Sequence, residues 1–402
     1  MRKKVFLFLV FLIISIVCLG GSYYVVEAET GDSQTEDEIE KELEDTISGQ
    51  LESVDFSGLQ EILDNLSKDG VGLFGSTSFW DKITRMLNGE FTQDYGSFFQ
   101  SVLSVFFEEI IGFIPLLATI ASVTILCSII GNLRGKENEN SVGQVVDFVC
   151  FGAVVVLIST VFVGFLQSAT GLMESMQNQM NIIFPILLTF LAGVGGTVSV
   201  GIFQPAVAIL STVIVQVFMN IIVPLFVFQF VFIVVNNFSP SVKLNKFISF
   251  ISSIFKWVAG VCFSIFLGVL AVQGVVAGSF DNVSIRAAKF AIKSYVPVLG
   301  GYLSDGFNVV MASSVLIKNV VGVAGIALLF ASILCPVVQI VACSLLLKFT
   351  SAILEPVTQT SKVPEFLYQV SKLLNLLVMM ILGVAFMYVI VIGLILCTAN
   401  IF

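Results

Sequence analysis

The 402-residue chain contains no histidine. Histidine is the commonest general base at neutral pH and the commonest zinc ligand, so its absence makes catalytic triads, zinc sites and haem ligation improbable. Charged residues are also scarce, at 12%, whereas 57% of the residues are hydrophobic. A soluble domain carries about 25% charged residues. The composition therefore indicates an integral membrane protein and argues against ordinary enzyme chemistry.

Recognisable metal, redox and nucleotide motifs are missing as well. All seven cysteines lie in apolar runs without CxxC spacing, which is typical of small hydrophobic residues inside helices. Gly135-Lys136 is followed by Glu137 and lacks the context of a phosphate-binding loop. We expect no catalytic residue, no metal, no cofactor and no nucleic-acid partner. Any energy source would belong to another subunit.

The few charges that are present divide the chain into two parts. Glu27 to Glu109 contains 20 acidic and four basic residues, whereas Ile110 to Phe402 contains 12 basic and eight acidic residues. Residues 1–28 resemble a signal peptide, with Arg2-Lys3-Lys4 before an apolar stretch, although an uncleaved anchor is the alternative. In both cases residues 29–109 are expected to form an acidic extracytoplasmic segment. A helix is predicted there after Ser57, from the spacing of Leu59, Ile62, Leu63 and Leu66.

Long apolar runs predict an all-α, polytopic membrane domain with six to eight transmembrane helices. A helix needs roughly 20 apolar residues to cross about 30 Å of hydrocarbon. Residues 110–166 contain two such runs and predict a transmembrane hairpin, followed by an outward-facing loop at 167–181. Residues 182–235 and 320–347 are longer than one crossing. The four single crossings are Ile110 to Ile130, Val145 to Leu166, Trp257 to Ala277 and Leu374 to Cys397.

An internal repeat is suggested by aligning the chain with itself. A shift of 112 residues places Pro185 on Pro297 and Pro224 on Pro336. This predicts two membrane repeats, residues 167–279 and 280–402. If each repeat crosses the membrane an odd number of times, the second is inverted relative to the first, as in many transporters. Chance alignment of apolar sequences is the alternative.

Two sets of polar residues are candidates for functional contacts. Thr212, Gln216 and Asn220 share one helix face, where they could form interhelix hydrogen bonds or line a pore. A short amphipathic helix is predicted around residue 289, with an apolar face opposite its basic one. It could bind lipid headgroups or an acidic partner, plain surface anchoring being the alternative. Its basic residues are Arg286, Lys289 and Lys293. Asp147, near a helix start, is expected to face interfacial water.

Several segments resemble the stage III sporulation protein AE family of endospore-forming bacteria. They are Leu267 to Gly274, Val283 to Phe290, Val296 to Gly300, and Ser314 to Asn319 with Gly322 to Gly325. The order of an exported segment followed by a polytopic domain also agrees.

The resemblance implies a non-enzymatic subunit of a channel-like complex in the mother-cell membrane around the forespore. The implied partners are other membrane subunits, including one on the forespore side, and the implied role is to sustain forespore development and the late forespore sigma factor. The alternative is an autonomous secondary transporter of an uncharged or weakly polar solute. A membrane-embedded enzyme would need a polar catalytic cluster that the sequence does not provide.

Overall fold

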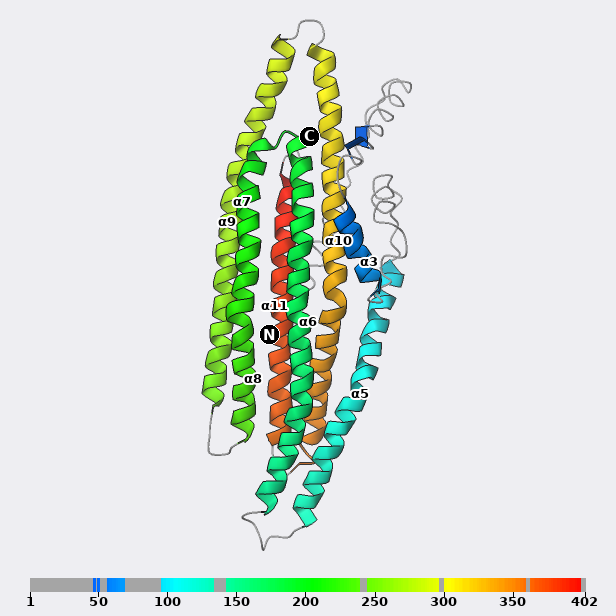
Figure 1. Ribbon diagram of the computed structural model, residues 1–402, viewed down its shortest axis with the longest axis vertical. Coiled ribbons are helices and arrows are strands. Elements are labelled where there is room, and N and C mark those ends of the chain that lie inside the picture. The colour runs from blue at the N-terminus through cyan, green and yellow to red at the C-terminus, as the bar shows by residue number, and fades with distance from the viewer. Residues whose placement is uncertain are drawn as a thin grey trace. The chain divides into compact units, whose positions relative to one another are not determined.

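The fold is a bundle of long antiparallel helices (Figure 1). The computed structural model describes residues 46–47, 49–50, 56–68, 95–133, 142–238, 244–295, 300–358 and 362–398. The chain divides into two units, Met1–Thr46 and Ile47–Phe402, and the bundle belongs to the second. Its helices are α3 (Ser57–Lys68), α5 (Tyr95–Leu133), α6 (Val142–Gly193), α7 (Thr197–Val217), the π-helix η3 (Phe218–Ile222), α8 (Val223–Phe238), α9 (Asn245–Tyr295), α10 (Gly300–Leu354) and α11 (Lys362–Cys397). The predicted all-α, polytopic class is confirmed.

Among the described residues, six helical segments are long and apolar enough to span a membrane: Val102–Ile130, Val145–Gly193, Thr197–Phe238, Asn245–Gly274, Gly306–Leu354 and Lys362–Cys397. Several are longer than a bilayer requires. The 52 residues of α6 and the 55 residues of α10 correspond to about 80 Å of helix, against about 30 Å of hydrocarbon. The number of spans lies at the lower limit of the predicted range.

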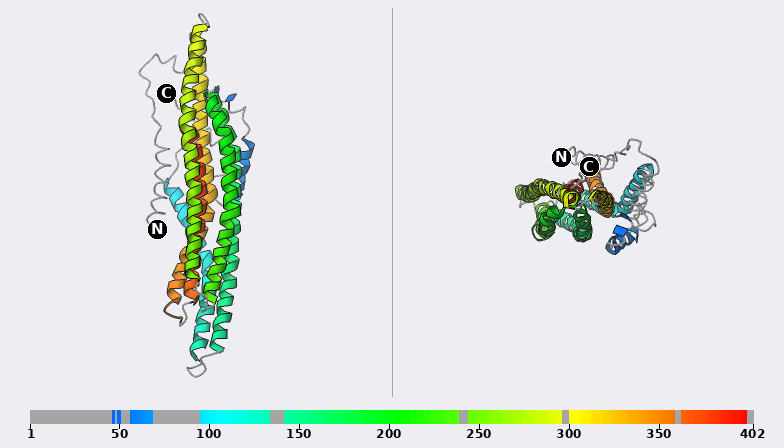
Figure 2. Two further views of the ribbon diagram at one scale, coloured as in Figure 1. Left: turned by 90° about the vertical axis from the view of Figure 1, so that its left-hand side faces the viewer. Right: turned by 90° about the horizontal axis from the view of Figure 1, so that it is seen from above.

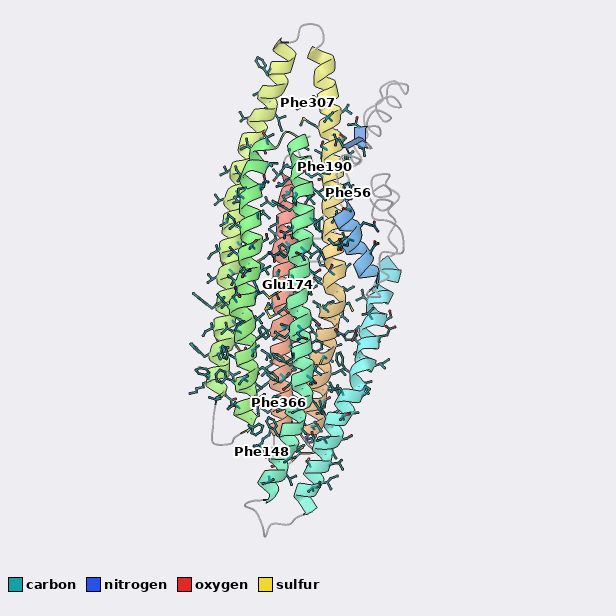
Figure 3. The ribbon with its side chains drawn as sticks, in the orientation of Figure 1. Phe56, Phe148, Glu174, Phe190, Phe307 and Phe366 are labelled. Carbon is teal, nitrogen blue, oxygen red and sulfur yellow. The ribbon has the colours of Figure 1, made fainter. Side chains whose placement is uncertain are left out.

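The core of the bundle is formed by α11, which packs against α6, α8, α9 and α10. Apolar residues cover all sides of this helix, and most of them are buried. A helix that is hydrophobic all round is stable where neighbours surround it. Phe366 of α11 is fully buried and contacts the rings of Phe151 in α6 and Phe230 in α8. Aromatic packing therefore holds three helices together near one end (Figure 3).

A tight turn joins α6 to α7. Gly195 adopts φ +89°, a left-handed conformation that glycine accepts without strain. A Cβ atom at this position would also lie 3.0 Å from Ile285 of α9. Asp281 of α9 is buried and accepts hydrogen bonds from the backbone N–H groups of Val198 and Ser199, at 3.1 and 3.3 Å. A carboxylate from a third helix thus caps the N-terminus of α7.

The π-helix between α7 and α8 has a local cause. Pro224 has no backbone N–H, and its ring displaces the preceding turn of the helix. The backbone N–H of Val223 bonds the carbonyl of Phe218, five residues earlier. The extra residue lets the chain continue in one direction from Thr197 to Phe238.

The structure corrects two predictions about the membrane domain. Residues 167–181 do not form a loop, because α6 continues without a break from Val142 to Gly193. Arg286, Lys289 and Lys293 do not belong to a separate short helix, because α9 extends to Tyr295. In both places the hydrogen-bonded helix continues through polar residues, whose side chains carry no signal that ends a helix.

The condition given for an inverted repeat, an odd number of crossings in each copy, is not met. The shift of 112 residues equates α7 and α8 with α10, and the later part of each repeat equates α9 with α11. Figure 1 shows α7–α8 and α10 running in one direction, and α9 and α11 in the other. Each copy contains two complete crossings, an even number, so the equated helices are parallel. The repeat itself stays a prediction, and its boundaries at 167 and 280 fall inside α6 and α9.

The helix predicted after Ser57 is confirmed as α3. Leu59 is fully buried, and a Cβ atom at Gly58 would lie 3.2 Å from Ile182 of α6. Gln50 lies close by, since its side-chain amide donates to the carbonyl of Val310 in α10 at 3.4 Å. This segment therefore docks on α6 and α10 of the same chain. The predicted signal peptide, residues 1–28, lies outside the described residues.

Candidate polar face of the α6–α7 hairpin

Polar side chains inside the bundle connect its helices. Gln179 of α6 donates to the hydroxyl of Ser332 in α10 at 2.6 Å. Lys318 of α10 is fully buried, and its ammonium donates to the carbonyl of Thr398 at the end of α11, at 2.6 Å. A cation is favourable at a helix C-terminus, where backbone carbonyls lack helical partners. Such bonds fix helices against each other within one copy of the chain.

The predicted polar stripe lies elsewhere, on an exposed face of α7 and η3. Thr212, Gln216 and Asn220 are all exposed. The Asn220 side-chain amide donates to Gln216 Oε1 at 2.7 Å, and the Thr212 hydroxyl donates to the carbonyl of Ala208 at 2.9 Å. These bonds stay within one helical stretch. The stripe therefore does not connect helices of the same copy.

A second polar row follows the neighbouring helix α6. Glu174, Asn178 and Asn181 are exposed on one face, while Met173 and Met176 are buried on the opposite face. Figure 3 shows Glu174 part-way along α6, far from either end. These residues were not among the predicted candidates, because residues 167–181 were predicted to form a loop. Their spacing of three and four residues is nevertheless a helical signal.

The two rows lie on neighbouring helices and overlap in height. α6 and α7 pack against each other on one broad side of the bundle (Figures 1 and 2). Glu174 and Gln216 are each 21 residues from the turn at Gly195, and Asn178 and Thr212 are each 17 residues from it. At a rise of about 1.5 Å per residue, each pair is level. We call Glu174, Asn178, Asn181, Thr212, Gln216 and Asn220 the α6–α7 polar face.

Large aliphatic side chains border this polar face on α7. Ile209 is 62% exposed and Val213 is 50% exposed. Amides and a carboxylate are costly in hydrocarbon, whereas exposed isoleucine and valine are unfavourable in water. A surface with both kinds of side chain matches another protein surface better than lipid or bulk water.

The remaining sequence candidates are dispersed. Arg286 is exposed on α9, and the side chains of Lys289 and Lys293 lie outside the described part of the structure. Asp147 is partly exposed in the second turn of α6. Among the other amides of the apolar helices, Gln229 is buried and donates to Ser252 of α9 at 2.6 Å. Gln204 is exposed, like Gln216 and Asn220, while Gln273 and Gln339 are partly exposed.

No metal-binding arrangement is found within the described ranges, where no three His, Cys, Asp or Glu side chains are grouped. Cysteines in those ranges are free thiols. The polar face holds one carboxylate among amides and a hydroxyl. This set can form hydrogen bonds and attract cations, but it includes no paired acid and base for proton transfer.

Comparison with known proteins identifies the family. The family model for stage III sporulation protein AE matches residues 77–399. The chain belongs to the stage III sporulation protein AE family. A relative in Bacillus subtilis (strain 168), stage III sporulation protein AE, is 26% identical over 347 residues, which cover 86% of each chain. No solved structure matches.

Membership in the AE family confirms the resemblance drawn from residues 267–325. The matched region contains every helix from α5 to α11, so it includes the α6–α7 polar face. The AE family and the six apolar helices together make this chain a multi-pass membrane protein of sporulation.

Proposed function

We propose that the chain is a non-enzymatic membrane subunit of a channel- or secretion-like complex between mother cell and forespore. In this role it sustains forespore development and the activity of the late forespore sigma factor. The observation that carries the proposal is the family match over residues 77–399, which contains every helix from α5 to α11. A polar face on an otherwise apolar bundle supports a subunit that contacts other proteins within the membrane.

The proposed location is the mother-cell membrane around the forespore, with the N-terminal segment outside the cytoplasm. Basic residues in two connections support this orientation, because cytoplasmic loops are enriched in Lys and Arg. In this orientation the basic cluster of Arg286, Lys289 and Lys293, toward the other end of α9, is the one that lies outside. The chain between α5 and α6 contains Arg134 and Lys136, and the chain between α8 and α9 contains Lys243. The C-terminal ends of α5 and α8 and the N-terminal ends of α6 and α9 lie at the same end of the bundle (Figure 1). The docking site of α3 lies toward the other end, next to Ile182 and Val310.

Cysteine accessibility tests this orientation. Asn245→Cys and Phe290→Cys lie near opposite ends of α9, and Phe290 is 71% exposed. In a background without the native cysteines, an impermeant maleimide added to intact cells should label position 290 and leave position 245 unlabelled until the membrane is permeabilised. Labelling of both positions from outside, or of position 245 alone, would contradict the proposed orientation.

The role itself is tested in the sporulating host. Deletion of the gene should arrest forespore development after engulfment and abolish a reporter of the late forespore sigma factor, and a tagged copy should restore both. The tagged chain should locate to the membrane around the forespore and co-purify with other membrane subunits. Normal reporter activity in the deletion strain would overturn the proposal. Solute uptake by the purified chain alone in vesicles would favour the autonomous transporter instead.

A further inference from the structure

We propose that two copies of this chain associate through the α6–α7 polar face. In the pair, the Glu174 carboxylate of one copy accepts a hydrogen bond from the Gln216 side-chain amide of the second copy. The proposal goes beyond the sporulation role, because it concerns contact between identical chains and does not depend on cargo or on other subunits.

The symmetry of the hairpin supports this pairing. Two copies of a membrane protein share one orientation, so a two-fold axis relating them runs along the bundle. Rotation by 180° about such an axis in front of the α6–α7 face brings α6 of one copy opposite α7 of the other. Heights do not change in this rotation. Glu174 then faces Gln216, and Asn178 faces Thr212, because each pair lies equally far from Gly195.

The hydrogen-bond donors and acceptors of the two rows are complementary. Gln216 uses its oxygen to accept from Asn220, which leaves the Nε2 hydrogens directed away from that bond. A carboxylate is a pure acceptor when ionised, and an amide–carboxylate bond is stronger than a neutral one. Asn178 and Thr212 each carry a donor and an acceptor. The opposing rows therefore match in hydrogen-bonding type at these two heights.

The aliphatic border of the polar face also supports the pairing. Ile209 and Val213 flank the amides on α7, with exposed fractions of 62% and 50%. In the proposed pair they surround the polar centre and shield it from lipid. Hydrogen bonds between polar side chains of different helices add to van der Waals packing at membrane helix interfaces.

Disulfide crosslinking between two tagged copies tests the pairing. One copy carries Asn178→Cys and the other carries Thr212→Cys, and both are co-expressed in the same membrane and oxidised. We expect a disulfide-linked product that contains both tags, well above the baseline that native cysteines give in a wild-type pair. Two copies with Val272→Cys, which is 65% exposed on α9, serve as the matched control and should stay at that baseline.

The same crosslinking assay also has outcomes that would contradict the pairing. A yield for Asn178→Cys with Thr212→Cys no higher than that for Val272→Cys, in copies that keep wild-type protease resistance, would overturn the proposal. Crosslinking of Asn178→Cys to a different protein in place of the second copy would also overturn it, as would labelling of position 178 by an aqueous maleimide without any crosslink.

Moving the carboxylate from position 174 to position 216 gives a second test. A folding defect would not be reversed by the second substitution. Gln216→Glu places two carboxylates opposite each other and should lower the dimer fraction about tenfold or more, because like charges at an interface are strongly unfavourable. Adding Glu174→Gln to the same chain exchanges donor and acceptor and should restore the dimer. Equal dimer fractions for the single and double variants, measured by light scattering in mild detergent, would contradict the proposed contact. The deletion phenotype tests the sporulation role separately.

Discussion

The interior around α11 and the α6–α7 polar face use similar side chains in opposite ways. Within the interior, Gln179 and Lys318 reach across to another helix of the same copy. On the polar face, Gln216 and Asn220 bond along their own helical stretch and leave the outer side exposed. Amides in apolar helices therefore have two roles here. Interior amides fix the fold of one chain, whereas those on the face are available to a second chain.

The largest effect on stability is expected from the aromatic cluster of the interior. Phe366→Ala should lower the free energy of unfolding by about 3–5 kcal/mol, because a fully buried ring is replaced by a cavity. Denaturant unfolding in detergent measures the change. Phe228 is 57% exposed on α8, so Phe228→Ala is the matched control and should cost much less. Equal losses for both variants would remove the distinction between interior and surface.

Overpacking the contact between α10 and α11 should have the next largest effect. A Cβ atom at Gly322 would clash with the side chain of Leu396, whereas a Cβ atom at Gly268 would meet nothing within 4 Å. We expect Gly322→Val to destabilise the bundle by about 1–3 kcal/mol. Gly268→Val should change stability little by comparison. Thermal unfolding of the two variants in the same detergent compares them, and a milder effect at Gly322 would show that α10 and α11 can separate freely.

Removal of the cap on α7 should lower the free energy of unfolding by a smaller amount than either of these changes. Asp281→Ala takes away the acceptor for the N–H groups of Val198 and Ser199, and we expect a loss of about 0.5–2 kcal/mol. The same variant should increase hydrogen exchange in the first turn of α7, which is measured by mass spectrometry. Asp281→Asn keeps an acceptor oxygen, so its stability and its exchange rate should lie between those of the wild type and those of Asp281→Ala. Unchanged exchange at residues 198 and 199 would mean that the cap is unimportant.

The smallest effect on stability is expected on the polar face itself. Glu174→Gln and Thr212→Val alter exposed side chains, so each should change the free energy of unfolding by about 0.5 kcal/mol or less. Dimer formation, in contrast, should respond to Thr212→Val, because the hydroxyl is lost. A destabilisation as large as that of Phe366→Ala would place the face within the fold of one copy and remove the contrast.

Much of the fold followed from local sequence properties. Apolar length predicted membrane helices, and Leu59 with its neighbours predicted α3, because both signals depend on residues close together in the chain. The polar face was predicted in part. Thr212, Gln216 and Asn220 were recognised from helical spacing, whereas Glu174 and Asn178 were not, since a window rich in Gln and Asn resembles a loop when its neighbours are unknown.

The sequence by itself determined that this chain is a helical membrane protein of the AE family with few titratable groups, since composition and family motifs need no spatial information. Only the tertiary structure decided which polar groups face inward. The turn at Gly195 folds α7 back along α6 and brings residues 42 positions apart, such as Glu174 and Gln216, to one height. That pairing depends on the position of the turn and on the continuity of both helices, which no single stretch of sequence encodes.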